Sequence, residues 1–530
     1  MSGFSDANRV GAGARGPRSF NIAGPSRPDR HYMLPPLDRL PEAAGVVEQQ
    51  GYFVVHAPRQ SGKTTTLRAL AAELTRSGRY AALTVSCEAG SAAGDDYVAA
   101  QGAVLDEIRY RADISLPLEL RPASWPGAAG ATLLRAGLAA WARECPRPVV
   151  LFLDEVDALG GQSLVTVLSQ LRAGYDERPD NFPASVVLCG LRDVREYGAP
   201  SLFNVSAEPF RLPDFTIDDV AALYEQHTTD TGQVFTKEGI EYAFELSQGQ
   251  PWLVNALARE VIERMGVPPS ESIGPRRLET AKERLSRQRT THLESLIARL
   301  RDPRVRAIIE PVILGDVVSG GSAHDDDVRY VRDLGLIAPD QPIRIANPIY
   351  REMILRALGS RVEANITVDP GSFVSDDGRL DFSRLLEEFA AFWRRHGDVL
   401  TEREAYHEAA PQLAVMAYLH RIVDAGGFVD RDYGIGRGRI DLCVRWPYEN
   451  DNGKRVWQYE AMELKVWHSH RPDPLPEGLD QVDEYLDSLE LGTATLVIFD
   501  RREDAAPVEE RVLFETARTP AGRTVEVLWA

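Results

Sequence analysis

One short segment, residues 57–64, constrains the fold of this 530-residue chain more than any other. It reads Ala-Pro-Arg-Gln-Ser-Gly-Lys-Thr, follows an apolar run over residues 52–56 and precedes a helical pattern over residues 65–74. When a turn joins a buried strand to a helix N-terminus, its backbone N–H groups converge on one point, and the helix dipole favours an anion there. The segment therefore predicts a phosphate-binding loop within an α/β domain.

The residue types of this segment suit the polyphosphate of a nucleotide. Gly62 allows close approach of the backbone, Lys63 places a cation near the β- and γ-phosphates, and Thr64 offers a hydroxyl to Mg²⁺. Ala57 stands where the motif has its first glycine, which removes some backbone freedom but no ligand. The residues expected to contact the nucleotide are Pro58, Arg59, Gln60, Ser61, Gly62, Lys63, Thr64 and Thr65.

A second apolar run, over residues 149–153, ends in two carboxylates. Asp154 follows the run directly and is expected to hold the Mg²⁺ shell. Glu155 comes next and is expected to orient or deprotonate the attacking water. An apolar strand that delivers carboxylates at its C-terminal end is the Walker B arrangement, and it supports the phosphate-binding loop about 90 residues earlier.

Short β-branched runs alternate with helical patterns from residue 51 to about residue 204. Buried strands separated by helices predict a parallel sheet that is covered on both faces. The runs are residues 52–56, 81–86, 149–153 and 185–189. The last run leads towards Arg192 and Arg195, for which two interpretations stay open. In the first, one of the two arginines senses the γ-phosphate or acts as an arginine finger for a neighbouring subunit. In the second, both are surface arginines.

Composition excludes several classes of protein. The net charge of −19 argues against a protein that binds nucleic acid non-specifically over its surface, and residues 361–530 alone carry −13. Any nucleic-acid chemistry in that region must therefore depend on a local site. The four cysteines are far apart and form no CxxC pair, which argues against a zinc ribbon or a disulfide framework and favours the cytoplasm. No apolar stretch reaches 18 residues, so we expect no membrane span.

The C-terminal region contains a second candidate site, made of charged residues. Glu463 and Lys465 are two apart in an apolar strand pattern and therefore share a face. A turn signal, Asp-Asn-Gly, is centred on Asn452, midway between Asp441 and Glu463. A hairpin folded there brings Asp441 opposite Glu463 beside Lys465. Two carboxylates and a lysine then form a pocket for a divalent metal ion such as Mg²⁺, which suits phosphodiester hydrolysis.

The pattern along the chain divides it into six parts. After a flexible tail come the phosphate-binding core, a helical lid, and a helix, glycine turn and short hairpin that resemble a winged helix. A linker then leads to a mixed α/β domain. In order, these parts cover residues 1–30, 31–205, 206–275, 276–360, 361–380 and 381–530.

Residues 31–356 resemble the AAA-like P-loop ATPases of the AAA+/STAND superfamily. The resemblance rests on the sequence of residues Ala57–Thr64, and on Gly249-Gln250-Pro251, which is similar to the "GxP" signature of their lids. A winged helix after the lid is also typical of that superfamily. The resemblance implies ATP-driven conformational switching, often with homo-oligomerisation.

The C-terminal region, about residues 381–502, resembles the PD-(D/E)XK nuclease superfamily, whose fold is that of restriction endonucleases. Asp441 matches the first acid, and Glu463-Leu464-Lys465 matches the E-x-K element. Gln481 and Tyr485 match the QxxxY helix of many members, and Glu408 is the candidate for the acid on an earlier helix.

These features predict an α/β multidomain protein in which an ATP- and Mg²⁺-dependent switch controls a nucleic-acid-cleaving domain. DNA is favoured over RNA as substrate, and prokaryotic defence or mobile-element biology is the expected setting. Two alternatives remain: a sensor ATPase whose C-terminal domain binds without cutting, and a DNA-remodelling or transposition-type ATPase. A basic helix face in residues 300–335 would favour DNA reading, but the arginines there are interspersed with acids.

Overall fold

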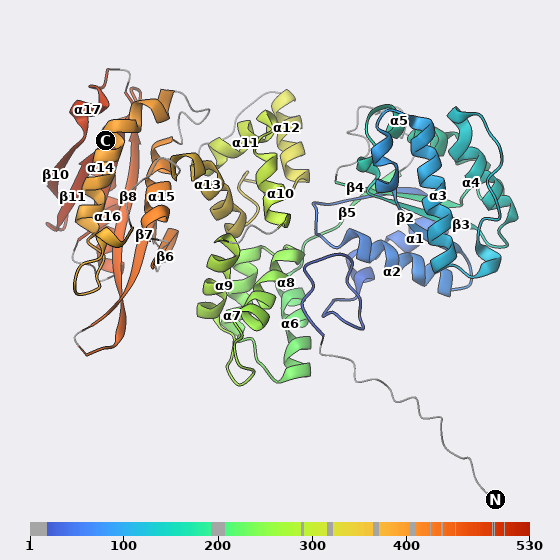
Figure 1. The fold of residues 1–530 in the computed structure, drawn as a ribbon, viewed down its shortest axis with the longest axis horizontal. Coiled ribbons are helices and arrows are strands. Elements are labelled where there is room, and N and C mark those ends of the chain that lie inside the picture. Colours follow the sequence, from blue (N-terminus) through green and yellow to red (C-terminus); the bar gives the residue numbers. More distant parts are fainter. Residues whose placement is uncertain are drawn as a thin grey trace, which may run out of the picture. The chain divides into compact units, whose positions relative to one another are not determined.

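The computed structural model describes residues 18–530, except residues 192–206, 288–290, 315–321, 364–369, 403–409, 424–425, 436–437, 451, 490, 492 and 503 (Figure 1). The chain forms two compact units. The first comprises Met1–Ile309 and Ser319–Arg351, and the second comprises Glu310–Val318 and Glu352–Ala530. No helix among the described residues is long and apolar enough to cross a membrane.

The core of the first unit is a five-stranded parallel sheet, as the alternating runs predict. The strand order is β2-β3-β4-β1-β5, so β1 is flanked by the last two strands. The strands are β1 (Tyr52–His56), β2 (Ala81–Ser86), β3 (Val149–Asp154), β4 (Ser185–Gly190) and β5 (Ala207–Arg211). The fifth strand was not predicted, because its sequence, Ala-Glu-Pro-Phe-Arg, lacks a β-branched run.

Helices cover both faces of this sheet, which accounts for the uninterrupted burial of β3 and β4. One hydrophobic cluster joins the sheet to α3, α4 and α5, and another joins it to α1 and α2. These helices are α1 (Ala43–Glu48), α2 (Lys63–Arg76), α3 (Tyr97–Ser115), α4 (Leu133–Glu144) and α5 (Gly161–Ala173). The first unit therefore has the core that the sequence predicts, a parallel sheet covered by helices on both faces.

A group of helices follows the sheet, where the sequence predicts a lid. They are α6 (Ile217–Thr231), α7 (Lys237–Ser247), α8 (Pro251–Arg259), which continues as a π-helical turn to Arg264, and α9 (Pro275–Arg287). Thr216 begins α6 with a capping box that it forms with Asp219. Gly249 must be glycine, because its φ is +75° and a Cβ there would lie 1.9 Å from the carbonyl oxygen of Phe215.

The segment before the core differs from the flexible tail that was expected over residues 1–30. Residues 18–34, here called the strap, make specific contacts within the first unit. Phe20 is 2% exposed and packs against Tyr32 and Tyr224. Arg18 forms an ion pair with Asp230 of α6, at 2.9 Å. The part of the tail up to residue 17 lies outside the described residues.

The region expected to be a winged helix, residues 276–360, begins within α9, and four described helices follow it: α10 (Thr291–Arg299), α11 (Pro303–Leu314), α12 (Ser322–Asp333) and α13 (Pro348–Glu363). The hairpin expected after α12 consists of one antiparallel bridge between Ile337 and Ile345. The linker expected over residues 361–380 is only partly separate, since Phe373 and Leu380 are buried in the core of the second unit.

The second unit contains a separate mixed sheet of six strands in the order β10-β11-β9-β8-β7-β6. Strands β6, β7 and β8 are antiparallel neighbours, whereas β8 and β9 are parallel and are joined by a helix, α16. The strands are β6 (Phe428–Ile435), β7 (Gly438–Glu449), β8 (Arg455–Trp467), β9 (Thr495–Asp500), β10 (Leu513–Arg518) and β11 (Thr524–Trp529).

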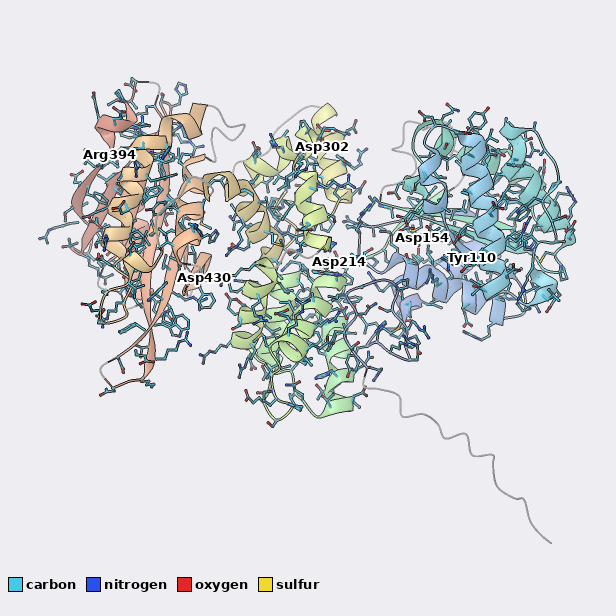
Figure 2. The ribbon with its side chains drawn as sticks, in the orientation of Figure 1. Tyr110, Asp154, Asp214, Asp302, Arg394 and Asp430 are labelled. Atoms are coloured by element: carbon cyan, nitrogen blue, oxygen red, sulfur yellow. The ribbon has the colours of Figure 1, made fainter. Side chains whose placement is uncertain are left out.

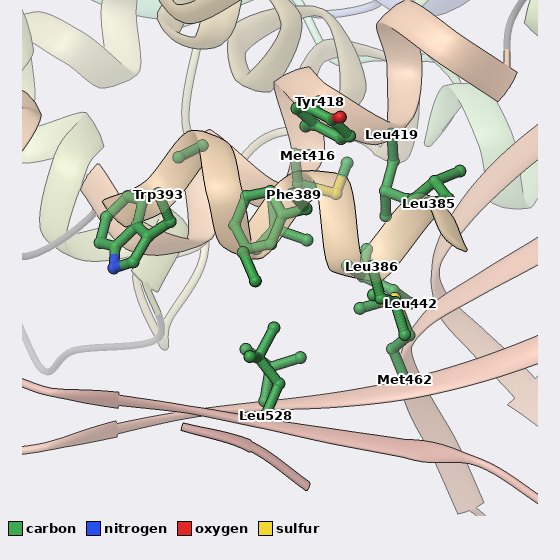
Figure 3. Close-up of a cluster of buried hydrophobic side chains, with 14 of the residues drawn as sticks. Leu385, Leu386, Phe389, Trp393, Met416, Tyr418, Leu419, Leu442, Met462 and Leu528 are labelled. Atoms are coloured by element: carbon green, nitrogen blue, oxygen red, sulfur yellow. The ribbon is translucent and has the colours of Figure 1, made fainter. Parts of the chain in front are cut away.

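The two faces of this sheet pack against different helices. On one face, Leu442, Met462 and Leu528 meet Phe389 and Trp393 of α14 in the main core (Figure 3). On the other face, Val482 and Leu486 of α16 pack against alternate residues of the same strands. Besides most of α13, which belongs to this unit from Glu352 on, the described helices of this unit include α14 (Phe382–Glu402), α15 (Ala410–Val423), α16 (Leu475–Leu489) and α17 (Val508–Arg511).

Candidate functional site

The phosphate-binding loop lies between β1 and α2, as predicted. Two of its residues, Gln60 and Gly62, have positive φ values of 62° and 91°. These left-handed residues turn the chain sharply at the N-terminus of α2, where backbone N–H groups have no partner within the helix. The loop therefore has the shape of an anion cradle at the carboxyl edge of a parallel sheet.

Lys63 closes over this loop. Its Nζ donates to the carbonyl oxygens of Ala57 and Pro58, at 2.6 and 2.8 Å. Burial lowers the pKa of Lys63, and the negative charge of Asp154 acts in the opposite direction. The two acceptors of this ammonium are backbone carbonyls of the loop, and an anion bound in the loop could replace them as acceptor.

Thr64 and Asp154 come together beside the lysine. The Thr64 hydroxyl donates to Oδ2 of Asp154 at 2.6 Å, although the two residues are 90 positions apart. Asp154, labelled in Figure 2, is 3% exposed at the end of β3. Hydroxyl and carboxylate oxygens are ligands that Mg²⁺ prefers, so these two residues fit the metal shell expected from the sequence.

Glu155 is held one residue further along, with a left-handed φ of 55°. Its carboxylate accepts a hydrogen bond from the hydroxyl of Ser86, which ends β2. Ser86 is paired with Asp154 in the parallel register of β2 and β3. Ser86 was not among the residues predicted from the sequence, although its place at the end of a neighbouring parallel strand was a usable signal. Arg192 and Arg195 lie outside the described residues.

A pocket adjoins the loop, with the strap on one side and α8 on the other. It encloses about 630 Å³ of space, its open mouth included, and its lining includes Gly62, Thr65 and Trp252. The amide of Ser26 donates to Oγ1 of Thr65 at 3.0 Å, and the indole Nε1 of Trp252 donates to the carbonyl of Ile22 at 2.9 Å. These two bonds fix the strap to α2 and to α8. The pocket continues from the phosphate cradle towards the lid.

The second unit brings Asp441 and Glu463 together. Strands β7 and β8 pair Leu442 with Met462, and one more step in this register places Asp441 opposite Glu463. The backbone amide of Leu464 donates to Oδ2 of Asp441 at 3.0 Å. Glu463 is 2% exposed, and its Oε1 lies 3.1 Å from Nζ of Lys465. The hairpin centred on Asn452 thus places the two residues in neighbouring strands, with the Asp441 carboxylate bonded to the backbone of Leu464.

Glu463 and Lys465 lie on the sheet face that α16 covers. Ala461, two residues before Glu463 on β8, belongs to the hydrophobic cluster on this face. Glu477 of α16 lies 3.3 Å from Nζ of Lys465. Burial by itself lowers the pKa of Lys465, but the carboxylates of Glu463 and Glu477 outweigh it and raise the pKa, so the lysine is a cation at neutral pH.

The other residues expected at this site are placed less completely. Gln481 lies on α16 one turn after Glu477, and its Oε1 is buried without a hydrogen-bond partner among the residues that the structure describes. The backbone of Tyr485 follows one turn later on the same helix. Glu408 lies outside the described residues.

Comparison with known proteins gives one family match, in the first unit. Residues 47–197 match the family model described as an AAA domain. This segment contains the phosphate-binding loop, Asp154 and Glu155, whereas the second unit lies outside it. No curated protein matches the chain.

Several solved structures match part of this chain at low sequence identity. A Walker-type ATPase of Pyrococcus abyssi has 16% identity and a TM-score of 0.46, over 63% of this chain and 99% of that one. The ORC2 protein of Aeropyrum pernix, in ADPNP and ADP complexes, has 14% identity and a TM-score of 0.36, over 61% and 94% of the two chains. The ORC1 protein of the same organism, in complex with DNA, has 13% identity and a TM-score of 0.36, over 62% and 93%.

Proposed function

We propose that the first unit binds ATP together with Mg²⁺ and hydrolyses it, and that the protein uses this cycle as a conformational switch. The observation that carries the proposal is the hydrogen bond between Thr64 and Asp154 beside the buried Lys63. It joins the two halves of a nucleotide site from distant parts of the sequence. The AAA match over residues 47–197 supports the same function.

Each residue of this site has a defined task. The loop amides and Lys63 bind the phosphates, with the lysine exchanging its two carbonyl partners for phosphate oxygens. Thr64 and Asp154 hold Mg²⁺, which supplies charge neutralisation on the β- and γ-phosphates. Glu155 orients the attacking water and accepts its proton. Its bond from Ser86 fixes the orientation of the carboxylate.

The pocket between the strap and α8 suits the base and ribose. It begins at Gly62 and Thr65 of the phosphate site, and both of its side walls carry apolar atoms, from Ile22 and Trp252 among others. Apolar walls with a few polar groups are typical of nucleotide and cofactor pockets. The nucleotide thereby contacts the core, the strap and the lid at once. ATP binding can therefore change the position of the lid.

Replacing Glu155 with Gln is expected to separate ATP binding from hydrolysis. The amide keeps the size of the side chain but cannot accept the proton, so kcat should fall about 100-fold or more while ATP still binds. The measurement is phosphate release together with a titration of ATP. Loss of ATP binding in this variant would contradict the role given to Glu155, and Glu88→Gln, in the same unit but outside the site, is the matched control.

A second candidate function, for the second unit, is Mg²⁺-dependent cleavage of nucleic acid. The observation that favours it is the register that places Asp441 opposite Glu463, with Lys465 on the same face. In this proposal the two carboxylates hold the metal ion, and Lys465 orients the water or stabilises the charge on the phosphate. The sequence charge of −13 over residues 361–530 opposes broad nucleic-acid binding, and it favours the alternative of a non-cutting binding module.

The arginines between residues 300 and 335 favour the DNA-remodelling alternative less than their number suggests. Arg304 forms an ion pair with Asp327 of α12, and Arg329 lies 3.5 Å from Asp326. Nearby acids therefore offset the positive charge that a DNA-reading helix face would need. From the sequence resemblance and the composition we also propose DNA as a partner, a homo-oligomer and a cytoplasmic location.

A further inference from the structure

Arg39 lies beside the phosphate-binding loop, outside the motif that defines it, and is one of the residues that line the adjoining pocket. It ends a short 3₁₀ helix, Pro36–Arg39, and its Nη1 donates to the carbonyl oxygen of Ser61 at 2.7 Å. Its Nη2 donates to the carbonyl oxygen of Pro213, in the segment between β5 and the lid. The guanidinium also lies over the ring of Phe215, 5.0 Å from its centroid.

The segment that Arg39 holds continues into the lid. The amide of Phe215 donates to the carbonyl oxygen of Gly249 at 2.8 Å, and Gly249 leaves no room for a side chain against Phe215. Gly249 is followed by the first turn of α8, which supplies Pro251 and Trp252 to the pocket. A continuous set of contacts therefore leads from the loop carbonyl of Ser61, through Arg39, to the pocket wall formed by the lid.

The side chain is suited to hold two carbonyls at once. Burial lowers the pKa of Arg39 to about 10, and Asp214 acts in the opposite direction, so the guanidinium is charged at neutral pH. Its planar fork bonds two acceptors in a fixed geometry, which a lysine cannot do. A Cβ at Gly62 would lie 3.0 Å from Nη1 of Arg39, so the fit of the guanidinium against the loop is close.

We propose that Arg39 is a positioning residue that couples the phosphate-binding loop to the lid. In this account it fixes the Ser61 carbonyl away from the phosphates, and it transmits the state of the loop to Trp252 through residues 213–215. The inference rests on the proposed ATP binding. It adds a residue outside the loop that determines both the affinity for ATP and the response of the lid.

The test uses the full-length protein with Arg39→Ala and Arg39→Lys. Arg79→Ala is the matched control, since Arg79 is an exposed arginine of the same unit that pairs with Glu48. The dissociation constant for Mg²⁺ with a slowly hydrolysed ATP analogue is measured by calorimetry. The emission of Trp252 at saturating analogue is obtained as the difference between each protein and its Trp252→Phe counterpart, because the chain has 8 tryptophans.

We expect Arg39→Ala to raise the dissociation constant about 10- to 100-fold, the range for losing hydrogen bonds from a charged group. We expect the wild-type protein to change its Trp252 emission at saturation and Arg39→Ala to lose this change, which a general loss of stability would not cause. Arg39→Lys should be intermediate in affinity and should decide the question if Arg39→Ala does not fold. Wild-type affinity and a wild-type Trp252 response in Arg39→Lys and any folded Arg39→Ala would overturn the inference. Absence of binding in the wild-type protein would instead refute the proposed function itself.

Discussion

Replacing Lys63 with Ala is expected to abolish ATP hydrolysis and to weaken ATP binding about 100-fold or more, as expected for losing a charge-assisted contact to phosphate. The reason is that Lys63 is the buried cation of the site, held over the loop by its bonds to Ala57 and Pro58. Alanine leaves the loop amides but removes the charge that binds the β- and γ-phosphates. Phosphate release and an ATP titration by calorimetry measure the two effects.

The matched control for this prediction is Lys237→Ala. Lys237 lies exposed on α7 in the same unit and forms a distant pair with Glu241, at 3.8 Å. It should keep the wild-type rate and affinity. Wild-type turnover in Lys63→Ala would contradict this assignment, because the ATPase activity would then arise elsewhere in the chain.

Replacing Asp441 with Asn, Glu463 with Gln or Lys465 with Ala is expected to eliminate nucleic-acid cleavage in each case. The three side chains are brought together by one hairpin, and groups that act as a unit give losses that do not add. A variant that combines two of the substitutions should therefore be no worse than either single one. Purified protein is incubated with plasmid, linear and single-stranded substrates, with and without ATP and Mg²⁺.

ATP hydrolysis should survive in all of these variants, because the ATP site lies in the other unit. The carboxylate variants should also lose Mn²⁺ binding at this site, whereas Lys465→Ala should keep most of it. Glu509→Gln, at an exposed position on α17 of the same unit, is the matched control. If the wild-type protein cuts none of the substrates, the non-cutting binding module becomes the better account of the second unit.

The parts of the structure that the sequence predicts best are those that depend on local pattern. A strand, a glycine-containing turn and a helix start are all encoded within residues 52–74, so the phosphate-binding loop is predictable. The pairing of Asp441 with Glu463 follows from a turn signal alone, since the register of a hairpin is fixed by its turn. The parallel sheet follows from buried runs between helices.

The parts that were missed depend on contacts distant in sequence. The strap has a composition typical of a flexible tail, and its order comes from Phe20 and Tyr32 packing against α6 more than 190 positions away. Ser86 reaches Glu155 only because β2 lies beside β3. Arg39 contacts Ser61 and Pro213, which no local pattern connects. Such contacts follow from the assembled fold, and residue spacing does not show them.

The most direct test of the central claim is ATP binding and turnover by the purified wild-type protein, with Mg²⁺ and with the metal chelated. The site of Lys63, Thr64 and Asp154 predicts saturable binding of one ATP per chain, with phosphate release that requires Mg²⁺. Binding should be tighter with the metal than without it. No detectable ATP binding in Mg²⁺, by a protein shown to be folded, would contradict the account.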